Sequence, residues 1–250
     1  MTLPVVLVHG GGHGSWCWQD VVPLIDGPVI AVDLPPKEIR GVPGPAAPLP
    51  EGKVMIADMV ESIIADADAA GFDRFVLVGH SFAGLSIAGT ANAHPDRVAQ
   101  LVFVSCIVPA EGESVIPSLD PAAQDMVRDA VAAGTSPVAT FDEATVRHVF
   151  CNDFTEEQTA FELAHFGTDT PHPLGEVVSR RGIPPELPKT WVRLGRDQMI
   201  EPARQDLMIE HLRASPGGVL DVVELDAGHN VMISQPQALA DIINKRAQDS

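Results

Sequence analysis

The sequence of 250 residues has no tyrosine, and aromatic residues make up only 5 % of it. Any site in this protein must therefore work without a phenolic proton donor. Basic residues are also scarce, since 16 lysines and arginines stand against 34 aspartates and glutamates, for a formal net charge of −18. Nucleic acids and anionic membrane surfaces require basic partners, so this charge argues against both. It is typical of a solvated acidic surface.

Cysteines are few, and the three that occur, Cys17, Cys106 and Cys151, form no C-x-x-C pair. This spacing indicates neither a zinc site nor a disulfide framework, and an odd number suits free thiols in a reducing compartment. A strand-like run follows Met1 almost at once, without a basic and apolar leader. No apolar run approaches the roughly 18 residues of a membrane span. We therefore expect a cytoplasmic protein.

Apolar residues make up 45 % of the chain, enough for a sizeable core, and they include six short runs rich in β-branched residues. The runs are Pro4–Val8, Val29–Asp33, Phe75–Val78, Leu101–Val104, Trp191–Leu194 and Leu220–Leu225. The first four are nearly all apolar, which is typical of strands covered on both faces of a parallel sheet. Helical patterns lie between most runs and nothing repeats. The sequence therefore predicts one α/β domain with a doubly wound, mostly parallel sheet of about six strands.

Several helices can be predicted from spacing and end signals. Apolar pairs recur every four residues over 55–64, which indicates a buried helix that ends at Gly71. A helix of small residues is expected over 82–94, before a proline stops it. Pro202 can begin another helix, and Ser234 can cap the last one.

Two stretches interrupt the alternation of strands and helices. Residues 34–52 are rich in proline and glycine and predict an exposed loop. Residues 107–189 separate the fourth strand from the fifth, and so long an insertion is better interpreted as a helical cap than as a loop. We therefore divide the chain into an α/β core, residues 1–106 and 190–250, and a cap, residues 107–189. One or two of the cap phenylalanines are expected to face a cavity.

Ser81 lies between an apolar strand and a helix of small residues, in the stretch FVLVGHSFAG. This context is typical of a nucleophile elbow, a strained turn that presents a serine hydroxyl at the carboxyl edge of a sheet. Strand and helix pass closely there, so the residues two before and two after the serine must be small. They are Gly79 and Ala83, the second a departure from the usual glycine. The alternative is a serine that merely caps the helix.

A nucleophilic serine needs a base, and the base needs an acid that orients it. His229, in DAGHN, and Asp197, in RLGRDQM, follow the sixth and fifth strand runs, and ligands of such folds bind where parallel strands end. Taken singly, His229 could be a turn residue and Asp197 a helix anchor, while Asp226 is a weaker candidate for the acid. Together with Ser81 they occur in the chain order Ser, Asp, His at three strand ends. The sequence therefore predicts a Ser-His-Asp triad.

Three consecutive glycines, Gly10 to Gly12, follow the first strand run after His9. Glycines let backbone amides approach a substrate carbonyl closely. We expect the N–H groups of Gly11 and Phe82 to form an oxyanion hole, a device that contributes on the order of 10²–10³ to the rate. A phosphate-binding loop is the alternative, but no lysine follows the glycines, and the G-x-G-x-x-G pattern fails at Ser15.

With these motifs the sequence resembles the α/β-hydrolase superfamily along essentially its whole length. More narrowly, it is similar to the branch that contains plant methylesterases, hydroxynitrile lyases and bacterial esterase-like relatives. The resemblance is carried by HGGGHGSW at residues 9–16, the GHS elbow, Arg193 and Asp197 with Pro202 and Gln205 after them, GHNVMISQP near the end, and the cap stretch VFCNDFTEE at residues 149–157.

The resemblance implies an esterase rather than a cyanohydrin lyase. Lyases of this branch carry threonine after the first histidine of the oxyanion loop and lysine after the catalytic histidine, and here these positions hold Gly10 and Asn230. The implied activity is hydrolysis of a carboxylic ester, or a lactone, with a small to medium apolar part, without metal or organic cofactor. The residues expected to contact this small-molecule substrate are His13, Trp16, Cys106, Phe150 and Phe154.

Other functions of the same constellation stay open at this point. They are a C–C hydrolase, another lyase, a cofactor-free perhydrolase, and a ligand receptor without catalysis. The substrate itself depends on the cap, of which the sequence gives only the composition. A homodimer is a further expectation, and the sequence does not choose between it and a monomer.

Overall fold

Six strands form one sheet in the computed structural model, which describes residues 2–41, 52–215 and 220–248. The strand order is β2-β1-β3-β4-β5-β6, and every neighbouring pair is parallel. The strands are β1 (Val5–Val8), β2 (Val29–Val32), β3 (Phe75–His80), β4 (Val98–Val104), β5 (Lys189–Leu194) and β6 (Asp221–Leu225). All six strands predicted from the sequence are therefore confirmed.

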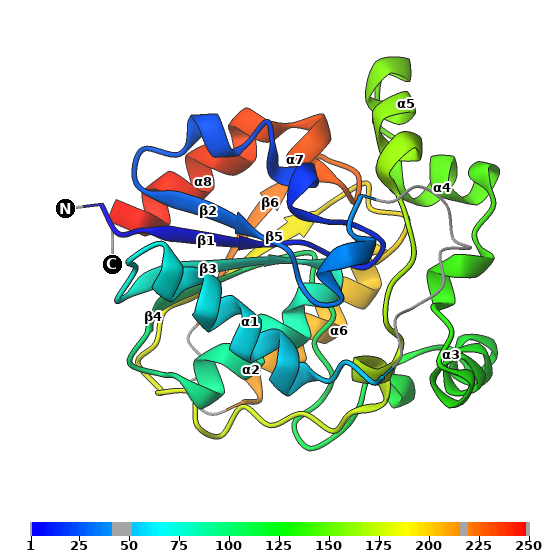
Figure 1. Cartoon of the computed structure of the whole chain (residues 1–250), viewed down its shortest axis with the longest axis horizontal. Helices are drawn as coiled ribbons and strands as arrows, with labels where there is room; N and C mark the ends of the chain where they lie inside the picture. Colours follow the sequence, from blue (N-terminus) through cyan, green and yellow to red (C-terminus); the bar gives the residue numbers. More distant parts are fainter. Residues whose placement is uncertain (1, 42–51, 216–219, 249–250) are drawn as a thin grey trace.

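Helices cover both faces of the sheet (Figure 1). The helices on one face are α1 (Ile56–Ala69), α2 (Gly84–Ala93) and α6 (Pro202–Arg213), and α8 (Pro236–Gln248) packs on the other. Successive strand residues point to opposite faces, so Val6 and Val8 belong to the first layer and Val5 and Leu7 to the second. All four are fully buried, which explains why β1 contains no polar residue.

The strand order reverses at β1, and this places the loops after β1 and β3 next to each other. From β1 the chain passes to β2 on one side, and it then returns to β3 on the other side of β1. Loops at such a reversal leave the sheet in opposite directions and open a crevice at the carboxyl ends of the strands. The glycine loop after β1 and Ser81 after β3 both lie at this crevice.

Three of the four helix predictions agree with the structure, and one is wrong in its detail. The helix α1 ends before Gly71, which has the left-handed φ of +74°, and α6 begins at Pro202. Ser234 does not cap the last helix, because it ends the short helix α7 (Val231–Ser234). The carbonyl of Gln235 instead accepts the hydrogen bond from Leu239 in the first turn of α8.

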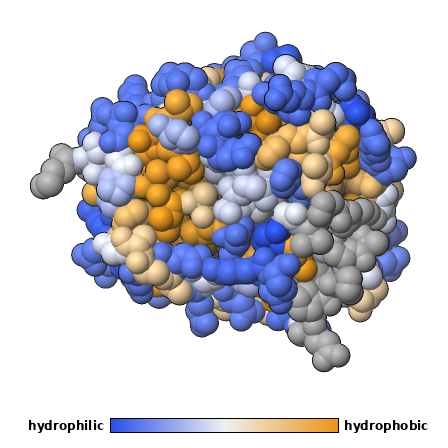
Figure 2. Space-filling model, turned by 45° about the horizontal axis from the view of Figure 1, so that its top comes forward, coloured by the Kyte–Doolittle hydropathy of each residue, from blue (hydrophilic) through white to orange (hydrophobic). Residues whose placement is uncertain are grey.

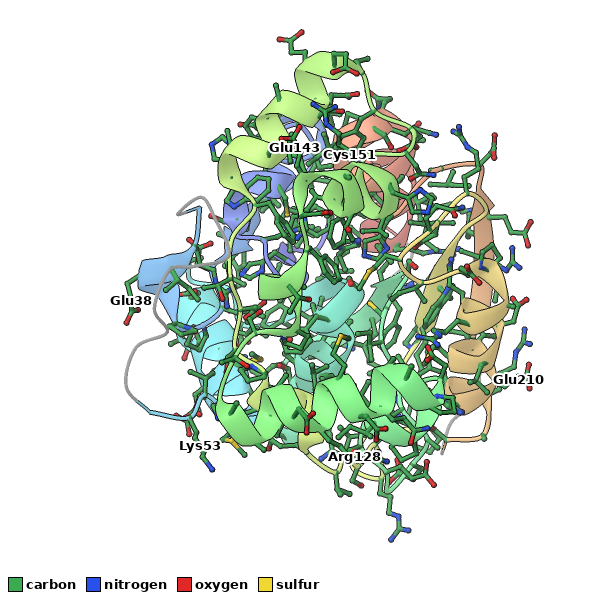
Figure 3. All side chains as sticks on the ribbon, turned by 90° about the vertical axis from the view of Figure 1, so that its right-hand side faces the viewer. Glu38, Lys53, Arg128, Glu143, Cys151 and Glu210 are labelled. Carbon is green, nitrogen blue, oxygen red and sulfur yellow. The ribbon has the colours of Figure 1, made fainter. Side chains whose placement is uncertain are left out.

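The insertion between β4 and β5 contains α3 (Pro121–Ala133), α4 (Glu143–Phe150) and α5 (Glu156–His165). They lie beyond the carboxyl ends of the strands, at the right of Figure 1. Figure 3 looks onto this edge, with Arg128 on α3 at one side and α4, between Glu143 and Cys151, at the other. The helices thus stand over the edge where Ser81 lies. Most of the loop predicted at 34–52 falls on residues 42–51, outside the described residues.

The surface is drawn by hydropathy in Figure 2. The face drawn in Figure 2 is mostly hydrophilic, with separate apolar areas. Within residues 2–41, 52–215 and 220–248, no helix is both long and apolar enough to pass through a lipid bilayer. All three cysteines are free and buried, as expected from their spacing.

Candidate active site

Ser81 occupies a strained turn directly after β3. Its φ is +55°, in the left-handed region that non-glycine residues rarely adopt. Strain of this kind persists only where surrounding structure enforces it, and it concentrates at functional sites. Here β3 holds the turn from one side, and the 3-10 turn Ser81–Ala83, which leads into α2, holds it from the other.

Close packing of strand against helix explains the small residues on both sides of Ser81. A Cβ added at Gly79 would lie 2.8 Å from the Ile87 side chain and 3.2 Å from the Ala83 methyl group. A Cβ at Gly84 would overlap the carbonyl oxygen of Ile107. Ala83 is fully buried, and its methyl group fits because position 79 has no side chain. The alanine at 83 is thus compatible with the elbow.

Asp197 and His229 are joined by a short hydrogen bond, from His229 Nδ1 to Asp197 Oδ2 at 2.7 Å. Both side chains are buried. A carboxylate can only accept, so the Nδ1 of His229 carries the proton and Nε2 is the basic nitrogen. Burial opposes ionisation of Asp197, but His229 and the hydrogen bonds outweigh it and hold its pKa below the ordinary value. The pair therefore consists of an ionised carboxylate that holds the His229 imidazole in one orientation.

Three further donors fix the Asp197 carboxylate. The N–H groups of Met199 and Ile200 each lie 2.8 Å from Oδ1, and the Ser105 hydroxyl lies 2.6 Å from Oδ2. Ser105 follows β4 directly and, like Ser81, has a positive φ, +40°. The sequence analysis did not single out Ser105, although its place at the end of a buried strand was a usable signal.

His80 supports the His229 loop. Its Nε2 donates to the carbonyl oxygen of His229 at 3.0 Å, and the two rings lie 4.5 Å apart. Burial, followed by the nearby histidines, lowers the pKa of His80, so its ring is neutral and adds no charge beside the base. Ser81 is the next residue along the chain. His80 therefore links the serine turn to the histidine loop.

The bond from Ser81 Oγ to His229 Nε2 is not formed in this structure. Among the described residues, Nε2 is buried without any hydrogen-bond partner. A basic nitrogen without a competing partner remains available to a hydroxyl, and such bonds often tighten only when substrate is bound. The structure thus brings the acid and the base together and places the serine beside their loops.

A cavity of about 180 Å³ opens next to Ser81, and Gly11 and Phe82 share its wall. The rest of its lining is mostly apolar and comes from the insertion, including Phe141, Phe150 and α3. The polar side chains in the lining are those of Ser81, Ser136, Asp169, Thr170 and Arg204. The two residues expected to donate their amides to an oxyanion thus flank the serine at the floor of an apolar pocket. A larger groove of about 380 Å³ lies between α1 and α2, away from this serine.

Only one of the five expected substrate contacts, Phe150, lines this cavity. His13 and Trp16 instead stack on each other, 5.2 Å between ring centres. Cys106 lies under the serine turn, where its thiol bonds to the carbonyl of Gly79 at 3.0 Å. Phe154 packs among the apolar residues of the core and the insertion. These four residues therefore pack around the cavity and do not line it. The spacing of the motifs does not reveal the neighbours that hold them there.

The insertion holds the glycine loop from outside. The N–H of Gly12 donates to Asp169 Oδ2 at 3.1 Å, and the carbonyl of Gly12 accepts from Gly167 at 2.9 Å. Asp169 is itself paired with the buried guanidinium of Arg40 at 3.1 Å. Gly12 has a φ of +75°, and a side chain there would overlap the Phe166 ring. The loop backbone is therefore fixed in place before any substrate arrives.

A buried ion pair lies behind the same loop. His13 Nε2 is 2.8 Å from Glu162 Oε1 of α5, and both side chains are at most 1 % exposed. His13 Nδ1 also donates to the carbonyl of Gly11 at 2.7 Å. Burial opposes the positive charge, but Glu162 outweighs it and raises the pKa of His13. The sequence motif located His13 but not its partner on α5.

Replacing Glu162 by alanine is expected to lower the free energy of unfolding by about 3–5 kcal/mol, because a buried imidazolium loses its counter-charge. Urea titration followed by circular dichroism measures the change. Glu157→Ala is the control, since Glu157 is an exposed residue on the same helix, and its loss should cost about 0.5 kcal/mol or less. Equal midpoints for the two variants would contradict a charged pair.

No group of three or more histidine, cysteine, aspartate or glutamate side chains among the described residues is arranged to hold a metal ion. The thiols are also unsuited to act as nucleophiles, since burial raises the pKa of Cys151 to about 12 and that of Cys106 further still. The serine hydroxyl and the His229 imidazole are the candidate reactive groups of this site.

The model of the Alpha/beta hydrolase family matches residues 5–242 of the chain. Among curated proteins, the chain is similar to a pyrethroid hydrolase of Sphingobium wenxiniae, at 29 % identity over 96 % of this chain and 85 % of the relative. It is also similar to methylesterase 1 of Arabidopsis thaliana, at 26 % identity over 97 % of this chain and 95 % of the relative.

Solved structures agree on the fold. An extracellular alpha/beta-hydrolase from a Paenibacillus species superposes with a TM-score of 0.75 at 21 % identity, over 97 % of this chain and 98 % of the other. A structure of a pyrethroid hydrolase gives a TM-score of 0.74 at 24 % identity, over 99 % of this chain and 98 % of the other. Identities this low carry the fold and no more.

Proposed function

Because the chain belongs to the alpha/beta hydrolase family, we propose that it is a serine esterase with Ser81 as nucleophile, His229 as base and Asp197 as the orienting acid. The observation that carries this proposal is the buried Asp197–His229 pair at 2.7 Å beside a serine held at φ +55°. The names of two full-length relatives, a pyrethroid hydrolase and a methylesterase, support ester hydrolysis as the class of reaction.

The mechanism follows from the roles of these groups. His229 Nε2 takes the proton of Ser81 as Oγ attacks the ester carbonyl, and Asp197 stabilises the imidazolium that forms. The amides of Gly11 and Phe82 bind the oxyanion. His229 then protonates the leaving alcohol, and it activates the water that hydrolyses the acyl-enzyme. No step requires a metal ion or organic cofactor.

The cavity supports a substrate with a small to medium apolar group. Its volume of about 180 Å³ is below the roughly 300–1,000 Å³ of drug-sized ligand sites. We propose that α3 to α5 act as a cap, because residues of the insertion supply most of the cavity wall. The cap then selects the acyl or alcohol group, while the core supplies the chemistry.

Asn230 favours hydrolysis over the cyanohydrin lyase reaction. Lyases of the resembling branch have lysine at this position. Here the Asn230 amide lies 3.1 Å from His13 Nε2, so a lysine would place a second cation against the buried His13–Glu162 pair.

Labelling with a fluorophosphonate probe tests the proposed function. We expect the probe to modify Ser81 alone, mapped by mass spectrometry of the digested protein, because only an activated serine attacks phosphorus at neutral pH. A ligand receptor without catalysis would stay unlabelled. Absence of labelling, with a known serine hydrolase labelled in parallel, would overturn the proposal.

A further inference from the structure

Two consecutive residues of the insertion, Asn152 and Asp153, touch the loops that carry the proposed acid and base. Asn152 Nδ2 donates to the carbonyl oxygen of Arg196 at 2.7 Å. Asp153 Oδ2 accepts from the N–H of Gly228 at 2.7 Å. Arg196 directly precedes Asp197, and Gly228 directly precedes His229. One turn of the insertion therefore holds both loops one residue away from the reacting groups.

Further contacts make this arrangement specific. The Asp153 side chain is only 2 % exposed, and its Oδ2 lies 3.7 Å from the Arg196 guanidinium. A Cβ added at Gly228 would overlap both Asn152 Oδ1 and Asp153 Oδ1, so the approach requires glycine there. The two loops are also bonded to each other, from Arg196 N to the carbonyl of Ala227 at 2.9 Å. The turn and the two loops form one connected unit.

The same turn is continuous with the substrate cavity. It follows α4, whose last residue, Phe150, lines the cavity and packs 5.5 Å from the His229 ring. The stretch from 150 to 153 thus contacts the pocket, the base and both supporting loops. A shift of about 1 Å in a reacting group can cost on the order of 10² in rate.

We propose that Asn152 and Asp153 are positioning residues that set the distance between Asp197 and His229 and the direction of His229 Nε2. The proposal rests on the function proposed above. It gives the insertion a second role besides selection of the substrate, because the turn keeps the acid and the base aligned. Neither residue lines the cavity beside Ser81.

The test compares Asp153→Ala with Asp153→Asn in hydrolysis of p-nitrophenyl butyrate by the full chain. Alanine leaves the Gly228 N–H without its acceptor, so kcat should fall about 10- to 100-fold while KM changes less than about 3-fold. Asparagine keeps an oxygen for this N–H and should restore kcat to within about 3-fold of the unaltered enzyme. Asn152→Ala, at an exposed position, should lower kcat in the same direction.

Asp142→Ala is the matched control for a merely structural role. Asp142 caps α4 of the same insertion by accepting from Thr145 N at 2.8 Å, so its loss should lower stability by about 1 kcal/mol. Its kcat, measured well below the unfolding temperature, should not change. An Asp153→Ala enzyme with full kcat would overturn the proposal, as would equal losses of kcat in Asp153→Ala and Asp142→Ala. If Asp153→Ala does not fold, full kcat in Asn152→Ala overturns it.

The rate of fluorophosphonate labelling separates this proposal from the proposed function. If the unaltered protein labels at Ser81 and Asp153→Ala labels as fast, positioning by the turn is refuted while the serine esterase stands. If the unaltered protein neither labels nor hydrolyses esters, the proposed function itself has failed, and with it the positioning role.

Discussion

Ser81→Ala is expected to lower kcat/KM for a p-nitrophenyl ester by a factor on the order of 10⁶, because no other group at the cavity floor can form the acyl-enzyme. The residual rate should come from binding and the oxyanion hole alone. The measurement is the initial rate of p-nitrophenol release over a range of substrate concentrations. Thermal unfolding of the variant should match that of the unaltered protein, which separates lost chemistry from lost structure.

Ser86→Ala provides a matched comparison for this variant. Ser86 lies on α2, which begins directly after the serine turn, and its buried hydroxyl bonds to the carbonyl of Ala83 at 3.1 Å. Its loss removes one hydrogen bond, worth about 1 kcal/mol of stability, and no reacting group. Full activity in Ser81→Ala, or complete loss in Ser86→Ala, would show that Ser81 is not the nucleophile.

Asp197→Asn is expected to lower kcat by about 10⁴-fold, through the wrong tautomer of His229. Two backbone N–H groups point at Oδ1, so the amide oxygen of asparagine must take that side. The NH₂ group then faces His229 Nδ1 and can only donate to it. The proton of the imidazole moves to Nε2, which can no longer accept the proton of Ser81.

Asp226→Asn is the control for the choice of acid. Asp226 is the weaker candidate that the sequence left open, and its side chain is 86 % exposed, 3.1 Å from the Arg196 guanidinium. Its substitution should leave kcat and KM unchanged in the same assay. If Asp226→Asn were inactive and Asp197→Asn active, the acid would be assigned to the wrong residue.

Much of the fold was predictable because it depends on local patterns. Strands buried on both faces are mostly apolar, so β1, β3 and the second half of β4 stand out in the sequence. The exact lengths depend on pairing partners. Residues 79 and 80 extend β3 because they pair with Phe103 and Val104 of β4. The start of β4 was missed because it contains Gln100, a buried polar residue whose amide bonds to Thr190 on β5 at 3.1 Å.

The meeting of Asp197 and His229 at one edge of the sheet was predictable for a similar reason. An elbow, a glycine loop and two loops at strand ends are each encoded by a few consecutive residues. A parallel sheet then brings strand ends to one edge, as it does for Asp197 and His229. The resemblance to α/β-hydrolases is confirmed by the family match over residues 5–242. Its esterase-like part is supported by the relatives named as a pyrethroid hydrolase and a methylesterase.

The surroundings of the site could not be predicted, since they depend on contacts between distant parts of the chain. The motif indicates that His13 lies near Ser81, but not that it turns away from the cavity toward Glu162. Likewise the asparagine and aspartate of VFCNDF carry no local sign that they reach the Arg196 and Gly228 backbones. The direction of a side chain is decided by its packing against distant residues. These contacts cannot be read from a single sequence.

The floor and the walls of the cavity beside Ser81 are formed by different segments of the chain. The floor, with Gly11, Ser81 and Phe82, comes from the loops after β1 and β3, whereas α3 supplies wall residues from a mostly exposed helix. Substitutions in α3 can therefore change which substrates fit the cavity without changing the groups that cleave the ester. Laboratory evolution toward new esters should therefore accumulate its first beneficial substitutions in α3. A variant in which α3 is replaced by a helix from another protein should keep its activity only when the replaced segment ends before residue 150.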